Sequence, residues 1–159
     1  MAESPRPPLQ CLGYFVTTLT VAANPKHNPG EKVNLTSDDL TVSAKCACTD
    51  KTARHWQVQL SIRQAAGPDK NAPYNFRLVL VGEFEVVDGF PVEHERRLVE
   101  TNATSILMGA AREVLRAAMS SGPYTPMLLP TWSFYQPSKE APDKKTKGVY
   151  ESRTTESRA

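Results

Sequence analysis

The sequence predicts an α+β fold in which a four-stranded antiparallel sheet is followed by a long helix. Four segments alternate apolar and polar side chains as strands do, and one later segment shows helical periodicity. The turns after the second and third strands are short, as expected of antiparallel neighbours. With 159 residues, 40% of them hydrophobic and 23% charged, the chain has the size and composition of one packed domain. We therefore expect four strands in meander order over a single core.

The first strand is expected over residues 12–23, where β-branched and aromatic side chains dominate. Two breaks follow, Asn24-Pro25 and Asn28-Pro29-Gly30, so residues 24–36 should form a loop or a crossover. Strict alternation would put Phe15, Thr17, Leu19 and Val21 on one face of the strand, and Tyr14, Val16, Thr18 and Thr20 on the other.

The remaining strands are expected over residues 39–49, 54–65 and 74–87, with a polar turn at 67–73. Their inner faces should carry Leu40, Val42, Ala44, Cys46 and Cys48, then Trp56, Val58, Leu60 and Ile62, then Phe76, Leu78, Leu80, Gly82, Phe84 and Val86. On the outer face of the fourth strand, Val79 and Val81 are too apolar for open water. This indicates a second covered surface, such as a contact with another subunit.

The helix is expected over residues 98–121, with Thr101 or Asn102 as its N-terminal cap. Gly122 and Pro123 should end it, because glycine suits a helix C-terminus and proline cannot continue one. Small residues over 109–111 keep one surface thin enough for another helix or sheet to approach.

An apolar, proline-rich segment follows the helix, and two interpretations of it stay open. Its large side chains could close over the sheet as part of the core. Alternatively, they could line an open apolar groove, because stiffening by Pro123, Pro126 and Pro130 limits the entropy lost on binding. The large side chains are Tyr124, Met127, Leu128, Leu129, Trp132, Phe134 and Tyr135.

Familiar catalytic and metal motifs are missing from the sequence. It contains no G-x-S-x-G, H-E-x-x-H, C-x-x-C or P-loop pattern. Cys46 and Cys48 could form half of a metal site with His55 or Cys11. Without a second cluster of such ligands, we expect two small buried apolar side chains and no metal.

The charge is distributed unevenly along the chain. Residues 138–159 hold six basic and four acidic side chains, which accounts for the whole net charge of +2. We expect a disordered tail there, a flexible tail over residues 1–10, and a single domain over residues 11–137. The balanced domain argues against nucleic-acid binding. Without a long apolar run or a secretory signal, we expect no membrane insertion and a cytoplasmic location.

The predicted helix carries three short motifs, Ile106-Leu107, Ala111-Arg112-Glu113 and Ser120-Ser121-Gly122. Their spacing resembles that in the long helix of the SecB family of protein-export chaperones. The run Gly82–Val86 is similar to the end of that family's last strand. The resemblance covers residues 12–136 and includes, after the helix, Gly122, Tyr124, Leu129, Pro130 and Phe134.

Several properties are implied by this resemblance. The helix would pack on one face of the sheet, two protomers would extend the sheet, and two dimers would form a tetramer. Such proteins are holdases that need neither ATP nor a cofactor. They bind unfolded or precursor polypeptides in apolar surface grooves for export and pass them to SecA. Carried over by position, the groove residues are Phe84, Tyr124, Leu128, Trp132 and Phe134, with Leu40 and Val42 as weaker candidates.

The chain also departs from the family pattern. Arg77 stands where the family has an acidic residue early in its fourth strand. The first strand reads Thr20-Val21-Ala22 where a Ser-Phe-Glu-like run is usual, and no cysteine or histidine follows His94. These departures favour client holding over SecA delivery. They also leave open a SecB-like chaperone of a toxin–antitoxin system.

Two other function classes remain. A small-ligand-binding protein or hydrolase would use His55 and Glu83 as acid-base residues, and a deep, closed pocket would favour it. A structural adaptor would use the apolar segment as a fixed interface.

Overall fold

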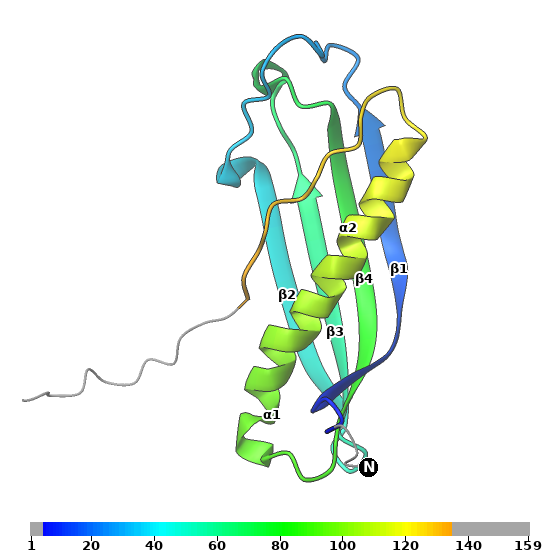
Figure 1. Ribbon diagram of the computed structural model, residues 1–159, viewed down its shortest axis with the longest axis vertical. Helices are drawn as coiled ribbons and strands as arrows, with labels where there is room; N and C mark the ends of the chain where they lie inside the picture. Colours follow the sequence, from blue (N-terminus) through cyan, green and yellow to red (C-terminus); the bar gives the residue numbers. More distant parts are fainter. Residues whose placement is uncertain (1–4, 135–159) are drawn as a thin grey trace, which may run out of the picture.

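A long helical segment lies across one face of a four-stranded antiparallel sheet in the computed structural model, which describes residues 5–134 (Figure 1). The strands are β1 (Leu9–Ala23), β2 (Leu40–Asp50), β3 (His55–Gln64) and β4 (Tyr74–Val86). The predicted fold class is confirmed. The expected C-terminal tail lies outside the described residues, and β1 begins within the last two residues of the expected N-terminal tail.

The strand order is β1-β4-β3-β2, so the predicted meander is correct only for β2, β3 and β4. β1 pairs with β4 along its whole length and never meets β2. The loop over residues 24–36 is therefore a crossover that carries the chain from one edge of the sheet to the other. Asn71 holds this loop, because its amide donates to the carbonyls of Asn28 and Glu31 at 3.0 and 3.1 Å.

The face assignment predicted for β1 is wrong, because the strand contains two bulges. Register shifts between Cys11 and Gly13 and between Val16 and Thr18 each insert one residue. Phe15 pairs with Val81 on the open face, whereas Leu19 pairs with Leu78 on the helix-covered face. β1 is exposed over most of its length.

The helical segment begins at Val92, six residues before the predicted start. It comprises α1 (Val92–Leu98), the π-helical turn η3 (Val99–Ala103) and α2 (Thr104–Ser120) without interruption. The predicted caps Thr101 and Asn102 therefore lie inside the helical segment, and Pro91 precedes it.

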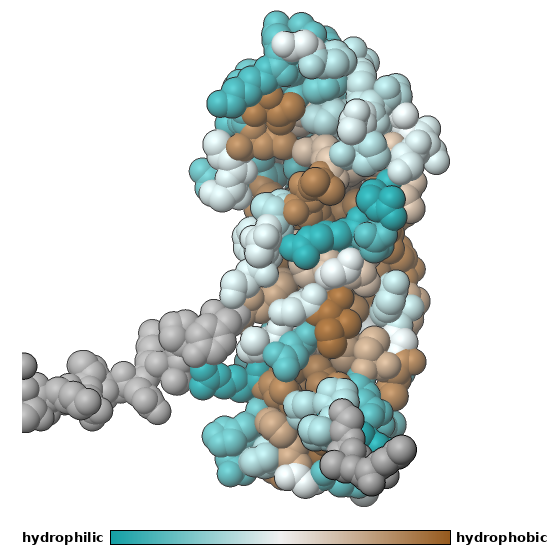
Figure 2. All heavy atoms as spheres, in the orientation of Figure 1, coloured by the Kyte–Doolittle hydropathy of each residue, from teal (hydrophilic) through white to brown (hydrophobic). Residues whose placement is uncertain are grey.

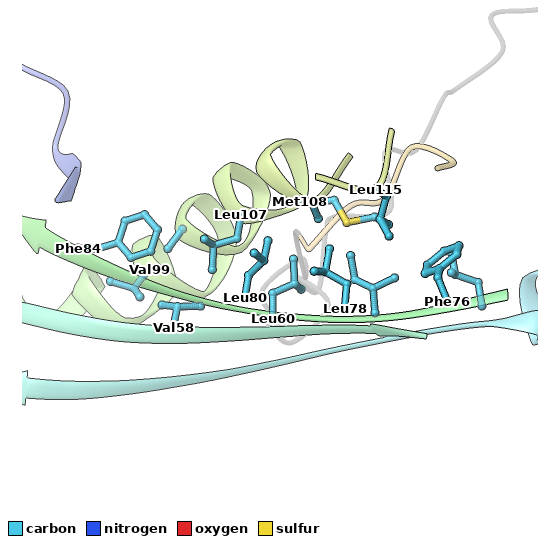
Figure 3. Packing of buried hydrophobic residues seen from close by; sticks show 14 of the residues in the cluster. Val58, Leu60, Phe76, Leu78, Leu80, Phe84, Val99, Leu107, Met108 and Leu115 are labelled. Atoms are coloured by element: carbon cyan, nitrogen blue, oxygen red, sulfur yellow. The ribbon is translucent and has the colours of Figure 1, made fainter. Parts of the chain in front are cut away.

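One core fills the space between the helical segment and the sheet (Figure 3). The inner faces predicted for β3 and β4 are confirmed, since their apolar side chains pack against buried helix side chains. Val79 and Val81 are 7% and 8% exposed within the single chain, so their apolarity does not require another subunit. The helical side chains buried in this core are Val99, Ala103, Leu107, Met108, Ala111, Leu115 and Met119.

Candidate polypeptide-binding grooves

After α2 the chain turns back and crosses the helix-covered face of the sheet toward β2 (Figure 1). We call residues 122–134 the strap. It has no helix or strand, and its turn is fixed by Tyr74. The Tyr74 hydroxyl accepts from the Tyr124 amide at 2.9 Å and donates to the Tyr124 carbonyl at 2.8 Å. Farther along, Arg112 donates to the Pro130 carbonyl at 3.1 Å.

The side chains of the strap pack only in part. Leu128 is 86% exposed, while Trp132 and Phe134 are half-buried against the core. Figure 2 shows apolar residues reaching the surface of this face between hydrophilic ones. The strap therefore fits both sequence interpretations, because its inner side chains close the core and its flanks leave open grooves.

The first groove, which we call the apolar groove, lies between the strap and the start of β2. Its volume is about 450 Å³. Four of its twelve lining residues have polar side chains, Thr36, Ser37, Gln64 and Thr131, and the Gln64 amide already donates to the Tyr74 carbonyl at 2.7 Å. The wall is therefore mainly apolar, with Leu35, Leu40, Phe76, Met127, Leu128, Leu129 and Trp132.

The second groove, which we call the mixed groove, lies between β2, the helical segment and the end of the strap. Its volume is about 500 Å³. Its apolar side consists of Val42, Ala44, Cys46, Trp132 and Phe134, and its polar side of Arg97, Glu100, Thr101 and Thr104. Trp132 therefore stands between the two grooves and lines both.

The mixed groove contains the thiol of Cys46. Burial raises the pKa of Cys46 to about 11, and the nearby Glu100 carboxylate adds to the rise. The thiol is thus neutral at ordinary pH and contributes an apolar surface. Within residues 5–134, His, Cys, Asp and Glu side chains nowhere gather in threes that could hold a metal ion.

The structure brings five of the seven predicted groove residues together. Leu40, Leu128 and Trp132 line the apolar groove, and Val42, Trp132 and Phe134 line the mixed groove. Tyr124 instead lines a separate cleft at the turn of the strap. Its hydroxyl donates to the Asn24 carbonyl at 2.8 Å, and its ring centroid lies 4.7 Å from that of His27.

Phe84 is not a groove residue, because its side chain is 0% exposed. Its ring lies over Gly82, where an added methyl group would sit 2.7 Å from the ring and 2.8 Å from Leu107. The alternation of β4 points Phe84 inward correctly, but this part of the inner face lies beneath the helical segment. Met127 and Leu129, which the sequence analysis named among the side chains able to line a groove, line the apolar groove. Cys46 was not predicted as a groove residue, although the alternation of β2 places it on the same face as Val42.

The rival acid-base pair lies away from both grooves. His55 and Glu83 lie on the open face of the sheet, where His55 contacts Glu85 with 3.9 Å between Nε2 and Oε1. Neither residue lines the apolar or the mixed groove.

The chain is similar to known proteins both in sequence and in fold. The chain is 24% identical over 135 residues to the protein-export protein SecB of Mesorhizobium japonicum, a match that covers 82% of this chain and 77% of that protein. The fold superposes with a TM-score of 0.60 on the Mycobacterium tuberculosis Rv1957 SecB-like chaperone, solved in complex with a ChAD peptide from the Rv1956 HigA1 antitoxin. The chain is SecB-like.

The structural match is 15% identical and covers 79% of this chain and 91% of Rv1957. No family model matches the sequence. Between residues 5 and 134, the structure has no helix with the length and apolarity needed to cross a membrane. The resemblance to SecB deduced from the helix motifs is thus confirmed by a sequence match and by the fold.

Proposed function

We propose that this protein is an ATP-independent holdase chaperone of the cytoplasm. It binds unfolded or precursor polypeptides by burying their apolar side chains in the two grooves, and it needs no cofactor. The observation that carries the proposal is the position of Trp132, which offers one ring to two neighbouring grooves. A polypeptide in an extended conformation can place side chains on both sides of that ring.

The names of the relatives support a chaperone role. One is a protein-export SecB, and the other is a SecB-like chaperone solved with a bound peptide. Burial of one large apolar client side chain contributes about 1.5–3 kcal/mol. Each groove alone is therefore a weak site, and useful affinity requires several contacts made by one client.

A dimer of dimers would supply such repeated sites. β1 is a sheet edge with five exposed apolar side chains, and a second copy pairing there would cover them. These side chains are Leu12, Tyr14, Phe15, Val16 and Leu19. The edge of β2, beside the mixed groove, stays available for backbone hydrogen bonds to a client.

Replacement of Trp132 by alanine tests the grooves. The full chain, the Trp132→Ala variant and the Trp132→Ala/Phe134→Ala variant are each mixed with reduced insulin, and aggregation is followed by light scattering. We expect the single variant to require several times more chaperone for equal protection and the double variant to lose most of it. Their oligomeric size should be unchanged.

Val92→Ala is the matched control, because Val92 is 74% exposed and lies outside both grooves. It should protect as the wild type does. Full protection by the double Trp132/Phe134 variant would eliminate the grooves as the client site.

The peptide-bound neighbour favours a second candidate, a SecB-like chaperone of a toxin–antitoxin system. In that role the chaperone protects a labile antitoxin. Competition separates the two roles: equal displacement of a bound client by many unrelated unfolded proteins supports the general holdase, and displacement by one antitoxin segment alone supports the dedicated one.

A further inference from the structure

Two arginines face each other on the open face of the sheet, opposite the helical segment. Arg63 in β3 and Arg77 in β4 are direct partners across the antiparallel ladder, and both are exposed. Side chains paired in this way start about 4.5–5.5 Å apart at their Cβ atoms, and like charges there repel. The pair lies on the two central strands, close to the end of the sheet where β3 ends and β4 begins.

Each edge strand adds a threonine to this pair. Thr20 of β1 is the partner of Arg77, and Thr41 of β2 is the partner of Arg63. We call these four residues, one from each strand, the arginine row. The next row on the same face consists of Thr18, Val79, Ser61 and Ser43, so this surface is rich in hydroxyl groups.

Neither arginine of the row is neutralised within residues 5–134, where no carboxylate lies within 4 Å of either guanidinium. Other arginines behave differently: Arg54, Arg96 and Arg116 each pair with a glutamate. The acidic side chains of the open face, Glu83, Glu85 and Asp50, lie toward the opposite end of the strands, beyond Lys45.

We propose that the arginine row docks an acidic segment of a partner polypeptide. A guanidinium binds a carboxylate through two parallel hydrogen bonds, and two adjacent guanidiniums suit two nearby carboxylates. Both rows lack an aromatic ring on which a nucleobase could stack, and the acidic end of the face repels a long phosphate backbone.

This surface is separate from the grooves. The helical segment and the core lie on one side of the sheet (Figure 3). The arginine row alternates with the core residues of β3 and β4, so it lies on the other side. A client in the grooves and an acidic partner on the open face can therefore be bound at the same time. The docking site does not depend on the holdase proposal.

The test uses a fluorescein-labelled 16-residue peptide of alternating glutamate and serine, with fluorescence anisotropy as the readout. At 50 mM salt, Arg63→Gln/Arg77→Gln should weaken binding at least tenfold. The matched control, Arg6→Gln/Arg116→Gln, removes the same charge at positions outside the arginine row and outside both grooves, and it should change affinity less than twofold. Protection of reduced insulin should be the same in all three proteins.

Three results would overturn the proposal. One is equal weakening by the control variant, which would mean that net charge alone binds the peptide. Another is equally strong competition by a thymidine oligonucleotide of the same charge, which would mean that any polyanion suffices. The third is a lower melting temperature for Arg63→Gln/Arg77→Gln, which would give the pair a structural role. Relief of like-charge repulsion should instead raise it slightly.

Discussion

Arg54 connects the β2–β3 turn to the β4–α1 loop and to α1. It is the last residue of the turn between β2 and β3. Its φ is 54°, a left-handed backbone conformation that is uncommon for residues other than glycine and asparagine. Its guanidinium donates to Glu95 at 2.8 Å, to the Val87 carbonyl at 2.8 Å and to the Phe90 carbonyl at 2.7 Å. Glu95 also accepts from the Trp56 indole at 2.7 Å. The Arg54–Glu95 ion pair thereby joins the β2–β3 hairpin, the β4–α1 loop and α1.

Glu95→Gln should destabilise the fold by roughly 3–5 kcal/mol, because it leaves the Arg54 charge buried without its partner. Urea unfolding followed by circular dichroism measures the change. Glu113→Gln removes a carboxylate from the exposed Arg116 pair and should cost less than about 1 kcal/mol. Equal effects of the two substitutions would contradict a special role for the buried pair.

At the scale of the elements, the position of the strap depends on Gly122, the residue at which it begins. Gly122 follows α2, and a methyl group added there would collide with the Tyr74 hydroxyl. That hydroxyl holds both polar backbone groups of Tyr124. Glycine at this position is therefore required by close approach, and the strap begins its path across the sheet from that contact.

Gly122→Ala should destabilise the protein by about 1–3 kcal/mol and weaken client protection, because the strap and Tyr74 must move apart. Gly109→Ala is the matched control, since a methyl group there meets nothing within 4 Å. In a helix interior it should stabilise by up to about 1 kcal/mol. Thermal unfolding and the insulin assay report both effects. A harmless Gly122→Ala would show that the Tyr74 contact does not set the strap.

At the scale of the whole molecule, the two edges of the sheet differ in chemistry. β1 exposes apolar side chains along much of its length, whereas the exposed positions of β2 include Thr41, Ser43, Lys45 and Thr49. An apolar edge favours permanent pairing with another copy, and a polar edge stays soluble when unpaired. For the proposed dimer of dimers, we therefore expect β1 to be the edge that pairs with a second copy.

Val16→Lys should reduce the assembly to a smaller species, because a lysine on an edge strand opposes pairing with another strand. Light scattering coupled to size-exclusion chromatography measures the mass, and circular dichroism checks that the sheet is retained. Ser43→Lys on β2 is the control and should leave the mass unchanged. If Val16→Lys stays fully assembled while folded, β1 is not the assembly edge.

Much of the fold could be predicted because its strands obey simple alternation. In β3, Trp56, Val58, Leu60 and Ile62 fall on one face, and all four are buried. Alternation failed in β1 because a bulge depends on how two strands fit together. Of the two bulges, only the one next to Gly13 contains a glycine that could have indicated it. The pairing of β1 with β4 was not predicted for a similar reason. Neither the length of the crossover loop nor the short turns determine which edge of the sheet β1 joins.

The grooves were only partly predictable. Trp132 and Phe134 line the same groove because residues two positions apart in an extended segment face the same side. Phe84 was misplaced because an inward-facing residue belongs to a groove only where no helix covers it. That depends on the path of the helical segment, which alternation cannot supply.

The position of Trp132 has a further consequence for spectroscopy. The chain contains only two tryptophans, and Trp56 is 6% exposed with its indole held by Glu95. Emission from Trp56 should therefore stay constant during loading, while the half-exposed indole between the grooves changes its surroundings whenever cargo arrives. Intrinsic tryptophan fluorescence should therefore report client binding in real time without any dye.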